Sequence, residues 1–204
     1  MDTSVRVKRY QDKRQEVLRV AGRVFARRGY HNTSLNHIGA ELGTTAAALY
    51  YYAKSKDQLL DNCRKLALQS IEAALVEGKQ KGANGYGQVR IFFERYAELI
   101  CSDFGRCLVL INLNDIPQPL RDSSRERQRA LHRDVRNLVH AGIEDGSIRP
   151  CDPSLITSML FGAFNHLTKW WSPDGPRSLQ AVATSYLDAL ATGIAPHGAP
   201  TTGH

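Results

Sequence analysis

Basic side chains, which could contact phosphate groups, gather near the N-terminus. Such groups hydrogen-bond to phosphate oxygens and so fix the register of a protein on a nucleic acid. The first 56 residues also hold 11 Lys and Arg against 4 Asp and Glu, whereas the rest of the chain holds 16 of each. The net charge of +7 therefore lies in the first quarter, which predicts an anionic partner, nucleic acid or a membrane surface, unless that segment is simply a solvated basic helix.

A second group of basic residues recurs later in the chain at helical spacing. Its members share one face of a predicted helix: Arg125, Arg129, Arg133 and Arg136. The planar guanidinium group suits phosphate oxygens. Two interpretations of residues 121–136 stay open. One is a solvated face paired with neighbouring acidic residues, and the other is an anion site for a phosphate-bearing ligand such as an acyl-CoA.

The motifs of common enzyme classes are missing from the sequence. It has no G-x-S-x-G, H-E-x-x-H, phosphate-binding loop or dinucleotide fingerprint. The four cysteines are Cys63, Cys101, Cys107 and Cys151, and no two have C-x-x-C spacing. We therefore expect no enzyme, no cofactor and no metal, with the thiols free and buried. A redox-sensing pair of Cys101 and Cys107 is the sharper alternative.

Three short helical patterns occupy the basic first quarter of the chain. Residues 12–28 form an amphipathic stripe that Gly29 ends. Thr33 or Ser34 can cap a second helix up to residue 42, and Thr44 or Thr45 a third over residues 46–52. Gly43 between them favours a tight turn. Two short helices joined in this way make a helix-turn-helix.

Further apolar stripes at helical spacing cover the rest of the chain, without the alternation typical of a strand. The predicted helices run over residues 56–78, 86–102, 103–113, 122–145, 153–171 and 177–194. With the three N-terminal segments they predict an all-α protein of about nine helices. No apolar run reaches about 18 residues and the N-terminus has no apolar signal segment, so we expect a cytoplasmic protein without membrane contact.

Three motifs within the first 60 residues resemble the N-terminal domain of the TetR (tetracycline-repressor-like) family of regulators. They are Gly-Tyr-x-x-Thr-Ser at 29–34, Ile-Gly-Ala-Glu-Leu-Gly at 38–43, and Leu-Tyr-Tyr followed by Ser-Lys at 49–56. Members usually have phenylalanine where Ala53 stands and often histidine where Tyr52 stands. The resemblance implies three N-terminal DNA-binding helices, a fourth helix that links them to a ligand domain, and two final helices that pair with a second subunit.

The resemblance also implies which residues contact DNA. The groove-facing positions of the third helix are Thr45, Ala46, Ala47 and Tyr50, and the phosphate-contacting positions are Thr33, Tyr51 and Lys56. Alanine methyl groups cannot make bidentate hydrogen bonds to bases, so we expect this helix to make few direct contacts that read the base sequence. Candidates for an arm in the minor groove are Arg6, Lys8 and Arg9. The open alternatives are that Thr33 only caps a helix, Tyr50 is core, Lys56 is solvated and the arm is disordered.

Aromatic and apolar residues of the C-terminal part supply candidates for a ligand pocket and a dimer interface. The pocket candidates are Phe92, Phe93, Tyr96, Leu108, Ile111, Asn112, Phe164, Asn165 and Trp170. The interface candidates are Leu155, Met159, Ala163, Leu167, Val182, Tyr186 and Leu190. A packed core is the alternative for the first set, and a buried hairpin within one chain for the second.

The predicted organisation has four parts. A flexible basic arm covers residues 1–9, a helix-turn-helix domain 10–56, a ligand-binding and dimerisation domain 57–195, and a disordered tail 196–204. The predicted function is a ligand-responsive regulator, a repressor by family habit, that binds a palindromic DNA operator as a homodimer and is released by a small-molecule effector, an acyl-CoA or another hydrophobic ligand. The alternative is a nucleic-acid-binding module without small-molecule sensing. Neither the effector nor the operator follows from the sequence.

Overall fold

Nine α-helices and one short 3₁₀ helix make up residues 3–193, the part of the chain that this computed structural model describes. They are α1 (Thr3–Arg28), α2 (Leu35–Glu41), α3 (Ala46–Leu49), α4 (Lys56–Lys81), α5 (Gly85–Cys101), α6 (Asp103–Leu110), η1 (Leu113–Asp115), α7 (Gln118–Glu144), α8 (Pro153–Trp170) and α9 (Leu179–Thr192). The described residues contain no strand, so the all-α prediction is confirmed. The expected tail at 196–204 lies outside them.

Side-chain caps set most helix starts. Ser34, Thr45 and Ser55 precede α2, α3 and α4, and each side-chain oxygen accepts a hydrogen bond from a backbone amide in the first turn. Gly29 follows α1 with φ +76°, a left-handed conformation that costs glycine little. The local chemistry of the sequence therefore fixes these boundaries.

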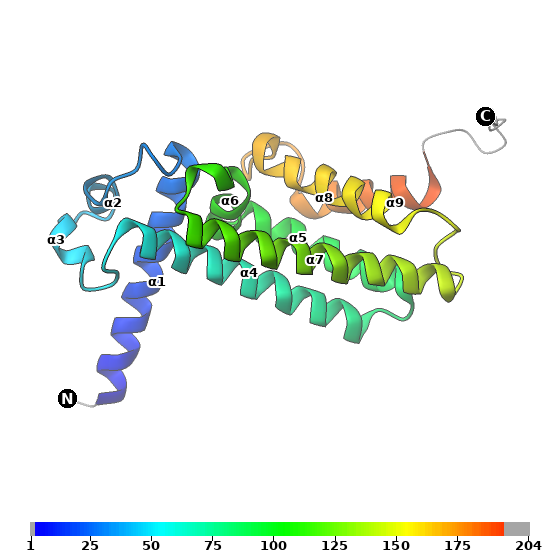
Figure 1. Cartoon of the computed structure of the whole chain (residues 1–204), viewed down its shortest axis with the longest axis horizontal. Helices are drawn as coiled ribbons and strands as arrows, with labels where there is room; N and C mark the ends of the chain where they lie inside the picture. The colour runs from blue at the N-terminus through cyan, green and yellow to red at the C-terminus, as the bar shows by residue number, and fades with distance from the viewer. Residues whose placement is uncertain (1–2, 194–204) are drawn as a thin grey trace.

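The first helix is longer than expected. α1 begins at Thr3, so residues 3–9 are helical where a flexible arm was expected, and Arg6, Lys8 and Arg9 are exposed on its first turns. Neither Pro nor Gly occurs between residues 3 and 21, so nothing in the sequence interrupts the helix. The N-terminal half of α1 projects from the body of the molecule (Figure 1).

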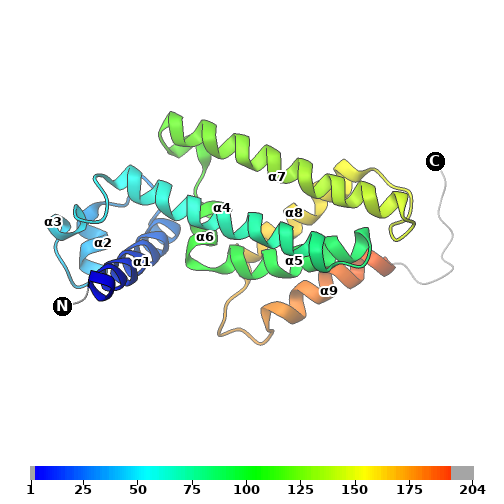
Figure 2. The ribbon, with the colours of Figure 1, turned by 90° about the horizontal axis from the view of Figure 1, so that it is seen from below.

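Two apolar cores lie at opposite ends of the molecule. The first combines α1–α3 and the start of α4 with Cys107, Ile111 and Ile116 from the α6–η1 segment. The second is formed by α4, α5, α7, α8 and α9 around a cluster of aromatic rings. α4 runs from the α1–α3 end into this helical bundle (Figure 2). The α4 and α6 helices thus connect the two cores physically.

Candidate nucleic-acid interface and effector cavity

The turn between α2 and α3 brings the two helices close together. A Cβ atom on Gly39 would lie 2.8 Å from the carbonyl oxygen of Thr44, so only glycine allows this approach. Gly43 adopts φ +66° within the same turn. This compact helix-turn-helix holds α3 at the end of the molecule that lies farthest from α9 (Figure 1).

Two neighbouring tyrosines follow α3 directly in the chain. The side chains of Tyr50 and Tyr51 are 58% and 69% exposed, while Leu49 between α3 and the core is fully buried. The structure therefore excludes Tyr50 as a core residue. Thr45 and Ala47 are exposed on the same short helix, and Ala46 is half-buried. Three of the four groove-facing candidates, Thr45, Ala47 and Tyr50, are therefore exposed to solvent.

An aromatic cluster supports these tyrosines from α1. The ring of Tyr10 lies edge-on to Tyr51, with centroids 5.3 Å apart, and stacks near Tyr52 at 5.7 Å. Tyr10 was not among the residues expected to contact DNA. Its signal was a single aromatic side chain in an otherwise polar and basic stretch.

Two of the predicted phosphate contacts hold the domain together internally. The Thr33 hydroxyl is buried and donates to the Gly29 carbonyl at 2.7 Å, and Ser34 rather than Thr33 caps α2. The Lys56 ammonium donates to the Tyr30 carbonyl at 3.0 Å and lies 4.0 Å from the centroid of the Tyr30 ring. Burial, together with the hydrogen bond to Asp57, raises the pKa of Tyr30 to about 12. A phosphate contact by Thr33 or Lys56 stays a prediction.

A cavity of about 360 Å³ opens among α4, α5, α6, α7 and α8, and we call it the inner cavity. Five of the pocket candidates line it: Tyr96, Leu108, Ile111, Asn112 and Asn165. The Tyr96 hydroxyl donates to Asn165 Oδ1 at 2.7 Å, which leaves the Asn165 amide nitrogen available to other partners. The rest of the lining is mixed: Leu68, Ile71, Leu131 and Phe161 are apolar, whereas Asn114, Ser124, Arg125, Gln128 and His132 are polar or charged.

The other four pocket candidates lie elsewhere. Phe92, Phe93 and Phe164 are fully buried in the second core, where their rings pack against one another and against Phe161. Trp170 is exposed at the end of α8. An apolar stripe identifies a buried helix face, but it does not distinguish a packed neighbour from a cavity.

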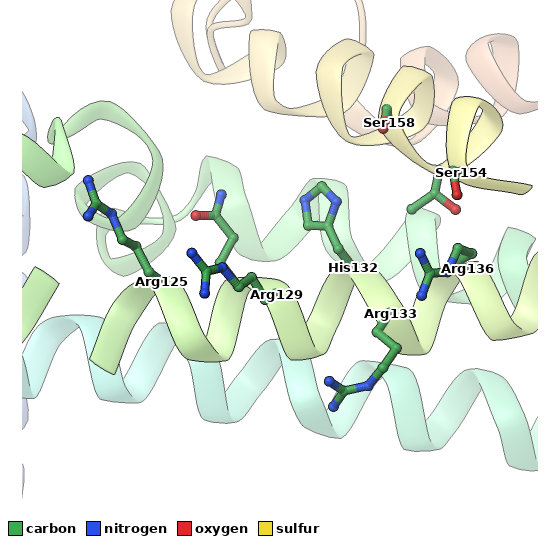
Figure 3. A pocket seen from close by; sticks show the side chains of 9 residues that line it. Arg125, Arg129, His132, Arg133, Arg136, Ser154 and Ser158 are labelled. Atoms are coloured by element: carbon green, nitrogen blue, oxygen red, sulfur yellow. The ribbon is translucent and has the colours of Figure 1, made fainter. Parts of the chain in front are cut away.

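A second, more open cavity of about 610 Å³ lies between α7 and α8, and we call it the outer cavity. Its lining is basic on one side and carries hydroxyl groups on the other: Arg125, Gln128, Arg129, His132, Arg133 and Arg136 from α7, and Ser154, Thr157 and Ser158 from α8. His132 rises from α7 towards α8, whereas the end of Arg133 extends towards the opposite side of α7 (Figure 3). All four members of the predicted arginine row therefore line this cavity, although the guanidinium group of Arg133 extends away from α8.

The two cavities adjoin each other. Arg125, Gln128 and His132 line both. The His132 ring stacks on Phe161 with centroids 4.1 Å apart, and burial lowers its pKa, which favours the neutral ring at neutral pH. Thr157 is buried at the outer cavity, and its hydroxyl has no hydrogen-bond partner among the described residues. Together the two cavities offer one continuous site, with four arginines along its outer part and a mixed polar and apolar lining in its inner part.

A charged residue that the sequence analysis did not consider also lines the inner cavity. Arg64 lies on α4 and is 4% exposed. Its signal in the sequence was a charge inside an apolar stripe, four residues after Leu60 and three before Ala67. A buried arginine at such a position needs acceptors that only the folded chain, or a ligand, can provide.

The structure divides the dimer candidates into two groups. Leu155, Met159 and Ala163 are exposed on α8, while Tyr186 and Leu190 on α9 are half-buried. The prediction was wrong for Leu167 and Val182, which are buried in the second core of the same chain. Leu167 lies on the α8 face that holds Leu160 and Phe164, so it packs inward. The exposed stripe of α8 instead continues through His166 and Trp170.

The cysteines form no disulfide among the described residues. Cys63 and Cys107 are buried, and burial raises the pKa of both thiols, that of Cys107 to about 12. Both are therefore protonated at neutral pH. No group of three or more His, Cys, Asp and Glu residues within 3–193 is arranged to hold a metal ion. Among the same residues, no helix is both long and apolar enough to span a membrane.

Known proteins resemble the chain along most of its length. It is 23% identical over 191 residues to the fatty acid metabolism regulator protein of Bacillus subtilis, covering 92% of this chain and 98% of the relative. It is 26% identical over 195 residues to the HTH-type transcriptional repressor KstR2 of Mycobacterium tuberculosis, covering 91% and 94%.

Solved structures share the fold. The TetR-family regulator PfmR of Thermus thermophilus superposes with a TM-score of 0.78 at 25% identity, covering 88% of this chain and 99% of that one. AibR in complex with isovaleryl coenzyme A and operator DNA superposes with a TM-score of 0.72 at 23% identity, covering 85% and 95%.

Two family models match adjoining parts of the chain. Residues 17–63 match the model of bacterial regulatory proteins of the tetR family, which spans α2, α3 and parts of α1 and α4. Residues 82–194 match the tetracyclin repressor-like C-terminal domain. This range contains α7 and α8, which line the outer cavity, and every wall of the inner cavity except α4. The second match alone covers more than half of the chain. The protein belongs to the TetR family of transcriptional regulators.

Proposed function

We propose that this protein is a dimeric repressor that binds a palindromic operator and releases it when an acyl-CoA thioester occupies the adjoining cavities. The observation that carries the proposal is the continuity of the arginine-rich outer cavity with the inner cavity, to which Leu68, Ile71, Leu131 and Phe161 contribute apolar surface. The names of the relatives support it, since they include a fatty acid metabolism regulator and a repressor. A neighbour that binds isovaleryl coenzyme A and operator DNA has the same fold.

The chemistry of the two cavities matches the two ends of such a thioester. Coenzyme A carries several phosphate groups, and arginine side chains bind phosphate oxygens with charge-assisted hydrogen bonds. Arg129 and Arg136 would bind these groups, and the unpaired Thr157 hydroxyl would donate to one of them. The acyl chain would enter the inner cavity between Leu68 and Phe161, where burial of its apolar surface stabilises the complex.

Release of DNA would follow from contacts between the cavities and the DNA-binding domain. Leu108 and Ile111 line the inner cavity, and Ile111 also belongs to the core of α1–α3. The two α3 helices of a dimer must lie about one DNA turn apart to enter successive major grooves. An effector that favours a different spacing would weaken operator binding by the difference in its affinity for the two states.

Removal of the outer arginines should weaken binding of an acyl-CoA. We expect Arg129→Gln and Arg136→Gln each to raise the Kd of hexanoyl-CoA about tenfold, because each removes charge-assisted hydrogen bonds of about 1.5–3 kcal/mol. Isothermal titration calorimetry measures both values.

The matched control is Arg127→Gln on the same helix. Arg127 is exposed, lies 3.8 Å from Glu72 and does not line the outer cavity. An equal loss of affinity for hexanoyl-CoA in this variant would mean that the overall positive charge of the protein, and not the cavity, binds the ligand. Failure of wild-type protein to bind hexanoyl-CoA or coenzyme A would overturn the effector class and favour a nucleic-acid-binding module without a sensor.

A further inference from the structure

Arg64 is a buried cation whose two contacts in this structure are neutral groups. Its Nε donates to Ser124 Oγ at 3.3 Å, and its Nη1 donates to the Leu108 carbonyl at 3.3 Å. Among the described residues no carboxylate lies within ion-pair distance of it. The nearby carboxylate of Asp61 pairs instead with Lys65 at 2.6 Å.

Such an arrangement leaves the charge of Arg64 without a counter-ion. Arginine stays protonated in proteins, and a charge withdrawn from water is normally paired. A guanidinium group has five N–H donors in a fixed fork that matches the two oxygens of a carboxylate. Because Arg64 lines the inner cavity, a molecule in that cavity can present those oxygens to it.

We propose that Arg64 binds a carboxylate at the inner end of the effector, so that the preferred effectors are acyl-CoA thioesters of dicarboxylic acids. The dicarboxylic part of this proposal rests on the proposed function, because the thioester end must reach the outer arginines. Arg125, Gln128 and His132 line both cavities and mark the passage between the two ends. The apolar wall of the inner cavity would then surround the methylene groups between thioester and carboxylate.

Arg64 also connects the inner cavity to the DNA-binding domain, so occupation of the cavity can affect that domain. Arg64 joins α4 to the carbonyl of Leu108 in α6. α6 in turn packs on α1, where Arg23 pairs with Asp103 at 3.2 Å. Cys107, next to Leu108, lies in the core of α1–α3. A carboxylate that draws the guanidinium away from Leu108 would therefore loosen the link between α4 and α6.

The test compares ligands that differ only in the terminal carboxylate. Adipoyl-CoA and hexanoyl-CoA have acyl chains of equal length, and calorimetry gives the Kd of each. We expect wild-type protein to bind adipoyl-CoA at least about tenfold more tightly, because a buried charge-assisted hydrogen bond raises the affinity for a ligand by about that factor or more. Arg64→Met should abolish this preference by weakening adipoyl-CoA and not hexanoyl-CoA, and Arg64→Lys should keep part of it.

The control variant is Lys79→Met, which removes an exposed charge on the same helix and should keep the full preference. Circular dichroism and operator binding without ligand verify that each variant is folded. If Arg64→Met does not fold, Arg64→Lys and the wild-type preference decide the question. Equal affinity of wild-type protein for both thioesters would overturn the carboxylate site and leave the proposed function intact.

Free hexanoate and hexanamide separate the two proposals, because they carry no coenzyme A. If no thioester binds but wild-type protein binds hexanoate, and not hexanamide, in a manner that requires Arg64, the carboxylate site stands and the acyl-CoA proposal fails. If neither the thioesters nor hexanoate bind, both proposals fail.

Discussion

Replacement of Met159 by aspartate should convert the dimer to a monomer and weaken operator binding more than about 100-fold. Met159 is 49% exposed on α8, within an apolar stripe that includes Leu155, Ala163 and Trp170. A carboxylate buried there without a partner would cost several kcal/mol in each subunit, and the twofold symmetry of a dimer brings the two charges to one interface. Sedimentation equilibrium measures the mass, and fluorescence anisotropy with labelled operator DNA measures the affinity.

The matched control for Met159→Asp is Val76→Asp. Val76 is 51% exposed and also lies on a long helix, but it belongs to α4, far from the α8 stripe in sequence and outside both predicted dimer helices. This variant should remain dimeric and bind operator DNA with unchanged affinity. A dimeric Met159→Asp protein would place the subunit interface on another face of the molecule.

Gly105→Ala should destabilise the protein by about 3 kcal/mol, which corresponds to a decrease of about 6–12 °C in Tm for a chain of this size. The added Cβ would lie 1.9 Å from the carbonyl oxygen of Leu99 and 2.4 Å from Cα of Ile100. Both atoms belong to the backbone of α5, so no flexible side chain can move aside. Differential scanning calorimetry measures the shift in Tm.

Gly87→Ala is the control for this effect. Its Cβ would lie 3.3 Å from Oδ1 of Asn84, the tip of a side chain that can shift by a few tenths of an ångström. We expect a change in Tm of less than about 3 °C, because only a small part of the overpacking cost arises. Equal effects of the two substitutions would show that the close α5–α6 contact at Gly105 does not limit stability.

The N-terminal part of the fold could be predicted because its signals are local. The signals that determine α2 and α3 all lie within a few residues of these helices. They are serine and threonine caps, glycine at a positive φ angle and apolar residues three or four apart. The start of α1 could not be placed in the same way. An exposed basic segment without Gly or Pro is compatible with either a helix or an arm, and the structure extends the helix through Arg6.

The candidate site depends on contacts between distant segments, which spacing alone does not reveal. Leu167 and Leu155 both fit an apolar α8, but the first is buried in the second core and the second is exposed. Phe93 and Tyr96 lie one turn apart on α5, yet only Tyr96 reaches a cavity. The burial of Arg64 could not be predicted from the sequence, because it depends on the packing of α6 and α7 against α4.

The measurement that tests the central claim most directly is an anisotropy titration of the protein against DNA flanking its own gene, with and without saturating adipoyl-CoA. We expect specific binding that weakens with rising salt, as phosphate contacts require, and at least about tenfold weaker binding in the presence of the thioester. Arg129→Gln protein at the same ligand concentration should release less DNA. Specific operator binding that stays unchanged while calorimetry shows the thioester bound would contradict the account, because the cavities would then not be coupled to α3.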